Sequence, residues 1–261
     1  MRKLILVLLP LLFLSCETTG DYVSKFIENA SETSSKFMNK HGIIVKNDPL
    51  TIINVNNYRD LPIQKKVKQA KADNLSDLVD QLIAGEDDVF KQVKNIHDWV
   101  ALNISYDAQQ YFSAEITKEQ TSSEVFKTKL AVCEGYSNLF SQMCTYAGIK
   151  STKISGYARG AGFSISGVEQ INSNHAWNAV FLDDNWYLVD STWDAGYLNG
   201  RHFEQEYETS YLFLEPENMI YTHYPEMKMW QLLEHPIEDS EFLDSPYLRG
   251  DYFQFVEHSD F

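Results

Sequence analysis

The stretch Ala131-Val132-Cys133-Glu134-Gly135-Tyr136 opens the pattern that decides the fold of this 261-residue chain. From Cys133 onward, apolar side chains recur every three or four residues, at Tyr136, Phe140, Met143 and Ala147. This spacing predicts a helix over residues 133–147, and Gly148 stands where a helix-ending glycine is expected. Cys133 would then lie in the first turn, where unpaired backbone N–H groups and the helix dipole favour a thiolate.

The hydrophobic pattern changes to simple alternation after Gly148. Residues 150–157, 175–182 and 186–191 predict strands, and Asp183-Asp184-Asn185 predicts a hairpin turn between the last two. Upstream, residues 87–102 carry another helical pattern. Helices followed by a run of strands favour an α+β domain, in which the helix that starts at Cys133 packs on an antiparallel β-sheet.

His175 and Asp190 are the other two candidates for chemistry. His175 opens one predicted strand and Asp190 closes its hairpin partner, so both are expected near the same end of the ribbon. An imidazole oriented by a carboxylate can act as base for a thiol and later as acid for a leaving group. Taken singly, each residue also has a structural reading: a buried cysteine, a half-buried strand histidine, a strand-end aspartate. Sequence alone does not set the strand register, so the His175–Asp190 contact is an inference.

Several blocks of the chain together resemble the core of the transglutaminase-like superfamily. Beyond residues 131–136, they are His175-Ala176-Trp177-Asn178-Ala179-Val180, Trp186-Tyr187-Leu188-Val189-Asp190-Ser191-Thr192-Trp193 and Asn103-Ile104-Ser105-Tyr106-Asp107. Two later blocks, Tyr221-Thr222-His223-Tyr224-Pro225 and Trp230-Gln231-Leu232-Leu233, resemble the branch related to kyphoscoliosis peptidase. One position departs from the pattern: Asp194 stands where the family often has glycine, which is expected to change the turn after the Asp190 strand.

The resemblance implies a papain-like fold with a Cys133, His175 and Asp190 triad. Cys133 and His175 would form a thiolate–imidazolium pair oriented by Asp190, and the implied reaction is acyl transfer through a thioester. Trp177, Trp193 and Tyr136 are candidates for the cleft wall, with core packing as their alternative reading. No metal or organic cofactor follows from the resemblance.

Three functions remain open at this stage. The first is a cysteine hydrolase that cleaves peptide or amide bonds. The second is an amine-accepting transglutaminase that cross-links proteins, because the same triad serves both acceptors. The third is a non-catalytic surface binding module on the same fold. In the first two cases the expected partner is a protein or peptide substrate.

The first residues predict export rather than part of the fold. Arg2 and Lys3 precede an apolar run from Leu4 to Leu14, which is too short to span a bilayer as a mature helix. Ser15-Cys16 at the end of the run resembles a bacterial lipobox, although Phe13 departs from its usual aliphatic residue. We therefore expect a lipoprotein signal peptide at residues 1–15, lipidation of Cys16, and anchoring to a bacterial membrane in the cell envelope. An ordinary signal peptide cut nearby is the alternative.

The rest of the chain reads as one domain with two flanking segments. With 44% hydrophobic residues, the chain can form one buried core. Residues 16–60 are expected to form a tether and N-terminal arm, residues 61–235 the transglutaminase-like domain, and residues 236–261 a C-terminal extension.

The net charge of the chain and the spacing of its potential metal ligands argue against nucleic acid and metal ions as partners. The formal charge is −15, and it becomes −17 without Arg2 and Lys3. A chain this acidic has no electrostatic footprint for nucleic acid. No two histidines have i,i+4 spacing and the cysteines lack CxxC spacing, so no metal site is expected. Histidines outside the triad, such as His97 and His223, are expected to be structural or solvated.

Overall fold

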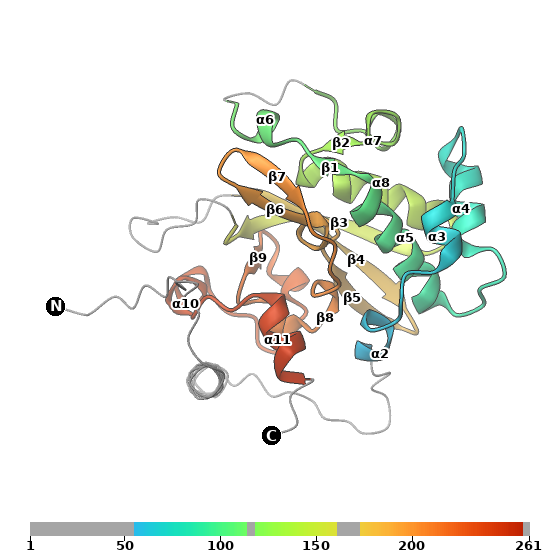
Figure 1. The fold of residues 1–261 in the computed structure, drawn as a ribbon. Helices are drawn as coiled ribbons and strands as arrows, with labels where there is room; N and C mark the ends of the chain where they lie inside the picture. The colour runs from blue at the N-terminus through green and yellow to red at the C-terminus, as the bar shows by residue number, and fades with distance from the viewer. Residues whose placement is uncertain (1–54, 114–117, 161–172, 258–261) are drawn as a thin grey trace, which may run out of the picture.

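The computed structural model describes residues 55–113, 118–160 and 173–257 (Figure 1). The predicted signal peptide, Cys16 and most of the predicted tether lie outside these residues. None of the helices in the described part is long and apolar enough to cross a membrane.

The first half of the described chain is helical. Its elements are α2 (Asn56–Arg59), α3 (Lys65–Gln69), α4 (Leu75–Ile83), α5 (Val89–Asn103), β1 (Ser105–Tyr106), α6 (Ala108–Tyr111), α7 (Ser122–Thr128), β2 (Leu130–Ala131) and α8 (Cys133–Tyr146). The long helix α5 begins where the Asp88 carboxylate accepts the N–H groups of Phe90 and Lys91. Helix α7 is capped by Thr121, whose hydroxyl oxygen accepts the N–H of Glu124.

The second half supplies the strands and several short helices. They are β3 (Lys150–Ala158), β4 (His175–Leu182), β5 (Asn185–Val189), η1 (Trp193–Ala195), β6 (Gly196–Asn199), β7 (His202–Gln205), β8 (Leu212–Leu214), α9 (Pro216–Met219), β9 (His223–Pro225), η2 (Lys228–Gln231), α10 (Asp239–Asp244) and α11 (Gly250–Glu257). The expected hairpin turn between β4 and β5 consists of Asp183 and Asp184, and both have the positive φ that a two-residue hairpin turn requires.

An antiparallel sheet with strand order β8-β5-β4-β3-β9 forms the centre of the molecule. Helices α3, α4, α5 and α8 gather on one side of it, and the C-terminal helices α10 and α11 lie on the other (Figure 1). Helix α8 packs on β3 and β4, and α5 packs on α8. The predicted α+β fold, with the Cys133 helix on an antiparallel sheet, is therefore confirmed.

Both faces of the sheet are covered by apolar side chains. Successive side chains of a strand point to opposite faces, so one strand can contribute to both layers. On β4, Val180 and Leu182 belong to the large core shared with the helices. Trp177 and Ala179 point the other way, into a cluster with Tyr211, Leu214 and Met219.

The C-terminal segment adds a third cluster of buried side chains. Ile237, Phe242 and Phe253 pack there with Tyr221 and other residues of the preceding chain. The buried Arg159, just after β3, donates to the carbonyl oxygens of Tyr221, Phe242, Ser245 and Pro246. These contacts hold α10 and the chain after it against the end of the sheet where β3 meets β9.

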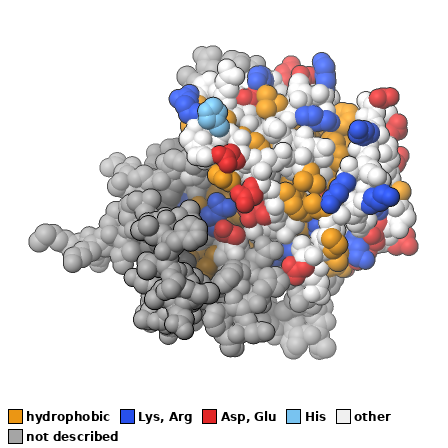
Figure 2. Space-filling view, in the orientation of Figure 1, with side chains coloured by type: hydrophobic (Ala, Val, Ile, Leu, Met, Phe, Trp, Pro, Cys, Tyr) orange, Lys and Arg blue, Asp and Glu red, His pale blue; other side chains and the backbone are white. Residues whose placement is uncertain are grey.

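Charged side chains on the visible face are mixed in sign. Figure 2 shows acidic and basic groups interspersed over the described part, around patches of hydrophobic atoms.

Candidate active site

Cys133 is the first residue of α8, where the sequence predicts it. The intrahelical hydrogen bonds begin with the N–H groups of Gly135 and Tyr136, which both donate to the Val132 carbonyl. The N–H groups of Cys133 and Glu134 therefore have no intrahelical acceptor and remain directed out of the helix end. Cys133 itself is half-buried.

The first turn of α8 is fixed by tight packing around Gly135. The side-chain amide oxygen of Gln120 accepts the N–H of Val132 at 3.0 Å. A Cβ atom at Gly135 would lie 2.5 Å from that same oxygen and 2.7 Å from the Ala131 Cβ. Only glycine lets the chain before the helix approach so closely, and this approach determines where Cys133 sits.

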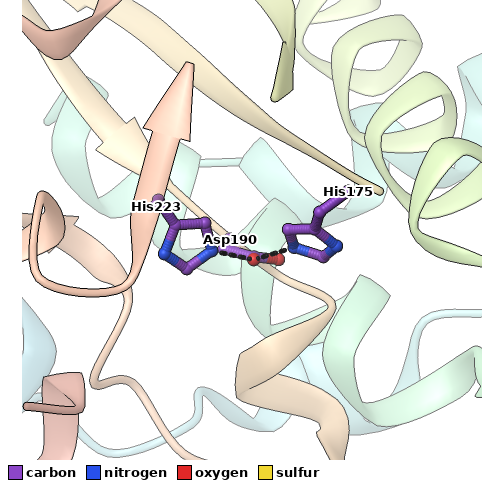
Figure 3. Close-up of side chains that lie close together, drawn as sticks. All are labelled: His175, Asp190 and His223. Atoms are coloured by element: carbon purple, nitrogen blue, oxygen red, sulfur yellow. Dashed lines mark hydrogen bonds and ion pairs between the residues drawn. The ribbon is translucent and has the colours of Figure 1, made fainter. Parts of the chain in front are cut away.

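His175 and Asp190 are in direct contact. His175 begins β4 and Asp190 follows β5 on the neighbouring strand, and His175 Nε2 lies 2.6 Å from Asp190 Oδ2 (Figure 3). The other carboxylate oxygen accepts the backbone N–H groups of Thr192 at 2.8 Å and Trp193 at 3.2 Å. The carboxylate is thus held at both oxygens in a buried position.

A second histidine reaches the same carboxylate from the opposite side of Asp190 (Figure 3). His223, on β9, places its Nε2 3.1 Å from Asp190 Oδ2, and its Nδ1 lies 2.8 Å from the Thr222 hydroxyl. His223 belongs to the block 221–225 that resembles the kyphoscoliosis peptidase branch, but its sequence context predicts only a structural or solvated histidine. Its contact with Asp190 could not be derived, because it depends on the pairing of β9 with β3.

The two histidines differ in charge. Burial lowers the pKa of His175, but the charges of Asp190 and Cys133, and hydrogen bonds to both, outweigh it and raise this pKa to about 10. For His223 burial dominates, and the charge of His175 adds to it, so its pKa falls to about 4. Burial by itself would raise the pKa of Asp190, yet the charge of His175 and hydrogen bonds from both histidines hold it well below its usual range. At neutral pH the centre therefore contains an imidazolium, a carboxylate and a neutral imidazole.

This arrangement settles the tautomer of His223. A neutral imidazole has one N–H, and the ionised Asp190 can only accept a hydrogen bond, so Nε2–H donates to Asp190 and Nδ1 accepts from Thr222. His175 uses its Nε2 for Asp190 and has its other nitrogen left for Cys133.

The potential ligand atoms of His175, Asp190 and His223 all lie within 4.8 Å of one another, a spacing that could hold a metal ion. Hydrogen bonds among the three groups account for this spacing without an ion, since both Nε2 atoms point at one carboxylate oxygen. The expectation that the chain uses no metal stays a prediction.

A cleft of about 320 Å³ lies in front of His175. Among the described residues, Arg249 is the one permanently charged side chain in its lining. The aromatic side chains of the lining are Tyr106, Tyr111, Trp193, Tyr197, Phe203 and Tyr247. Cys133 is not among the lining residues, but its charge acts on His175, Tyr106 and Tyr111, which are. The thiol therefore lies beside the cleft wall, and among these three side chains it is His175 with which it forms a hydrogen bond.

Two of the three expected wall residues belong to the core instead. Trp193 lines the cleft. Trp177 and Tyr136 are buried and do not line it. Trp177 packs behind the histidines, with its ring 5.0 Å from that of His223. Tyr136 donates from its hydroxyl to the Ile104 carbonyl at 2.5 Å, because it points into the helical layer.

Asp194, the departure from the family pattern, has a defined structural role. It is fully buried in η1, accepts the backbone N–H of Tyr211 at 2.9 Å, and pairs with His97 Nε2 at 2.9 Å. Of the two roles expected for His97, structural or solvated, the structure shows the structural one, because its side chain is fully buried. The pair ties α5 to the chain that follows Asp190.

Comparison with known proteins agrees with this geometry. Residues 76–191 match the model of the transglutaminase-like superfamily. The matched segment contains Cys133, His175 and Asp190, but not His223. The chain is 31% identical over 183 residues to kyphoscoliosis peptidase of Mus musculus, a match that covers 69% of this chain and 27% of that protein. It is 28% identical over 207 residues to hillarin of Drosophila melanogaster, covering 74% of this chain and 25% of hillarin.

This chain therefore spans only about a quarter of the length of these curated relatives. Among solved structures, it is similar to that of a TGase at 18% identity, with a TM-score of 0.35, over 74% of this chain and 41% of that one.

Proposed function

We propose that this protein performs acyl transfer through a thioester on Cys133, and that its main reaction is hydrolysis of peptide or amide bonds. The observation that carries the proposal is the 2.6 Å contact between His175 and Asp190, with His175 on the wall of a cleft and Cys133 at the adjoining helix N-terminus. The name of the mouse relative, a peptidase, supports water as the acceptor.

Each residue has a defined part in the proposed reaction. The Cys133 thiolate attacks the substrate carbonyl carbon, and the C=O electron pair moves to the oxygen. When the tetrahedral intermediate collapses, the C–N bond breaks and the His175 imidazolium protonates the leaving amine. His175, now neutral, deprotonates a water that attacks the thioester and releases the acid. Asp190 keeps the imidazole oriented and stabilises its charged form.

Alkylation of Cys133 by iodoacetamide at different pH values tests the ion pair without a known substrate. We expect a high rate already near pH 6, since the His175 imidazolium holds a reactive thiolate. Because the pKa of His175 is raised to about 10, the imidazolium persists above neutral pH, and the rate should stay level until His175 loses its proton near that value. His175→Ala should lower the rate at pH 6 by at least about tenfold.

Labelling is followed on the Cys133 peptide by mass spectrometry, with Cys144 as an internal control. Cys144 is fully buried on the same helix, and burial raises the pKa of its thiol, so it should stay unlabelled in the folded protein. A Cys133 rate that rises only above pH 8 and ignores His175→Ala would overturn the proposal and favour the binding module.

The acceptor is tested after acylation by p-nitrophenyl acetate. Hydrolysis predicts that the acetyl-Cys133 thioester decays in water alone at the steady-state rate of turnover. Decay that depends on an added primary amine, with the amide as product, would assign the transglutaminase reaction instead.

We further propose that the protein is attached to a bacterial membrane through lipid on Cys16 and acts on proteins or peptides of the cell envelope. The support is the apolar run before Ser15-Cys16 and the acidic charge, which would not itself attract an anionic lipid surface.

A further inference from the structure

Tyr106 is brought to the start of α8 by strand pairing. Strand β1 pairs with β2 in parallel, with Tyr106 opposite Ala131, two residues before Cys133. The next N–H, that of Asp107, donates to the Ala131 carbonyl at 2.8 Å and closes the pairing. These bonds fix the backbone of Tyr106 beside the segment that enters the helix at Cys133.

The ring of Tyr106 is held from several sides. Its centroid lies 5.8 Å from that of Tyr111, 6.4 Å from that of Tyr136 and 6.1 Å from that of Phe203. The side chain is half-buried and lines the same cleft as His175. Aromatic packing of this kind leaves little freedom to the position of the hydroxyl.

The hydroxyl itself has no hydrogen-bond partner among residues 55–113, 118–160 and 173–257, unlike that of Tyr136, which donates to the Ile104 carbonyl. Burial raises the pKa of Tyr106, and the charge of Cys133 raises it further. The Tyr106 hydroxyl is therefore a protonated donor on the wall of the cleft that His175 also lines, next to the chain segment that leads into Cys133, and it is still available.

We propose that the Tyr106 hydroxyl and the backbone N–H of Cys133 together form the oxyanion site of this enzyme. This inference rests on the proposed function. When the Cys133 sulfur bonds to the carbonyl carbon, the oxygen gains a full negative charge, and both donors bind it. The charge disappears when the C=O bond re-forms and the leaving group departs with a proton from His175. A rigid donor that binds the oxygen only when it carries the negative charge lowers the activation barrier of acylation. It does so without strengthening the binding of the substrate in its ground state.

Tyr111 is the competing donor, because it lines the same cleft and the charge of Cys133 also acts on it. It is 39% exposed and its ring packs against Phe112, with centroids 5.0 Å apart. A more exposed hydroxyl is a weaker preorganised donor, because water competes for it.

Two reactions at the same thiol separate oxyanion binding from thiol activation. Acylation by p-nitrophenyl acetate passes through a tetrahedral oxyanion, whereas alkylation by iodoacetamide displaces iodide at a saturated carbon and does not. We expect Tyr106→Phe to slow acylation by about 100-fold, the effect of removing one oxyanion donor, with the alkylation rate and its pH profile unchanged. The melting temperature should also stay unchanged, because phenylalanine keeps the ring contacts. Tyr146→Phe, at the exposed far end of α8, is the matched control and should leave both rates unchanged.

Three results would overturn the assignment. Equal acylation rates in Tyr106→Phe and the unmodified protein would show that the hydroxyl is not a donor. A parallel loss of acylation and alkylation would mean that Tyr106 acts on the thiol instead. A loss in Tyr111→Phe, with Tyr106→Phe unaffected, would assign the role to Tyr111. If the unmodified protein is not acylated at Cys133, the proposed function fails and the oxyanion site fails with it.

Discussion

Asp190 is the residue on which the site depends, because four hydrogen bonds converge on its buried carboxylate. Two come from the backbone and two from His175 and His223. His175 is charged and faces the cleft, whereas His223 is neutral and enclosed by Trp177, Trp193 and Tyr211. His223 therefore acts through Asp190 rather than on a substrate, and we regard it as a positioning residue.

Replacement of His223 tests this role. His223→Phe keeps the ring volume but removes one donor from a buried carboxylate, so the free energy of unfolding should fall by about 1–3 kcal/mol. Alkylation of Cys133 at pH 6 should slow several-fold, because Asp190 orients His175 less firmly. His223→Gln, which retains an N–H donor, should recover part of that rate. Both are measured by urea unfolding and by the iodoacetamide assay.

The control for this replacement is His97, which is also buried. His97→Phe breaks the pairs with Asp98 and Asp194 but leaves Asp190 untouched, so it should lower stability without slowing alkylation. If His223→Phe leaves the rate of Cys133 alkylation unchanged, His223 contributes only to packing and does not position Asp190.

At the scale of elements, β3 joins β4 and β9, the strands that carry His175 and His223. Gly156 is paired with His175 on β4 and with Pro225 on β9. A Cβ atom at Gly156 would collide with the ring of Trp177 and with the Tyr224 carbonyl. Glycine is therefore required here for β9 to approach closely enough to bring His223 to Asp190.

We expect Gly156→Ala to lower the free energy of unfolding by about 1–3 kcal/mol through overpacking, and to slow Cys133 alkylation by moving β9. Gly160→Ala is the matched control for stability, because its Cβ would meet only Trp193, at an ordinary 3.4 Å. Urea unfolding of both variants makes the comparison. If Gly156→Ala is as stable as Gly160→Ala, the sheet accommodates the methyl group and the close approach is not required.

At the scale of the whole molecule, the proposed anchor and the folded domain are separate features. The proposed signal peptide and Cys16 precede residue 55, where the described structure begins, and the proposed triad lies entirely within the described residues. Attachment and chemistry can therefore be tested independently.

The anchor is tested by Cys16→Ser in a bacterial host. The unmodified chain should fractionate with membranes, and its mass should show diacylglycerol on Cys16 at the mature N-terminus. Cys16→Ser should lose the lipid, while Cys133 alkylation in the folded domain stays the same. A lipid-free unmodified protein cut at another residue would instead indicate an ordinary signal peptide.

Local patterns determined a large part of this protein. Periodicity predicted helix α8 and strands β3 to β5, and two aspartates with positive φ form the turn that brings His175 near the end of β5. The contact between His175 and Asp190 could be inferred because a short hairpin joins them, so their positions follow from local geometry.

Only the tertiary structure decided the rest of the site. His223 is 33 residues from Asp190, and Tyr106 reaches the start of α8 through a two-residue parallel pairing. Tyr136 and Trp177 resemble cleft residues in sequence, yet both are buried. Long-range pairings and the direction of an aromatic ring depend on how whole layers pack, and no spacing along the chain records them.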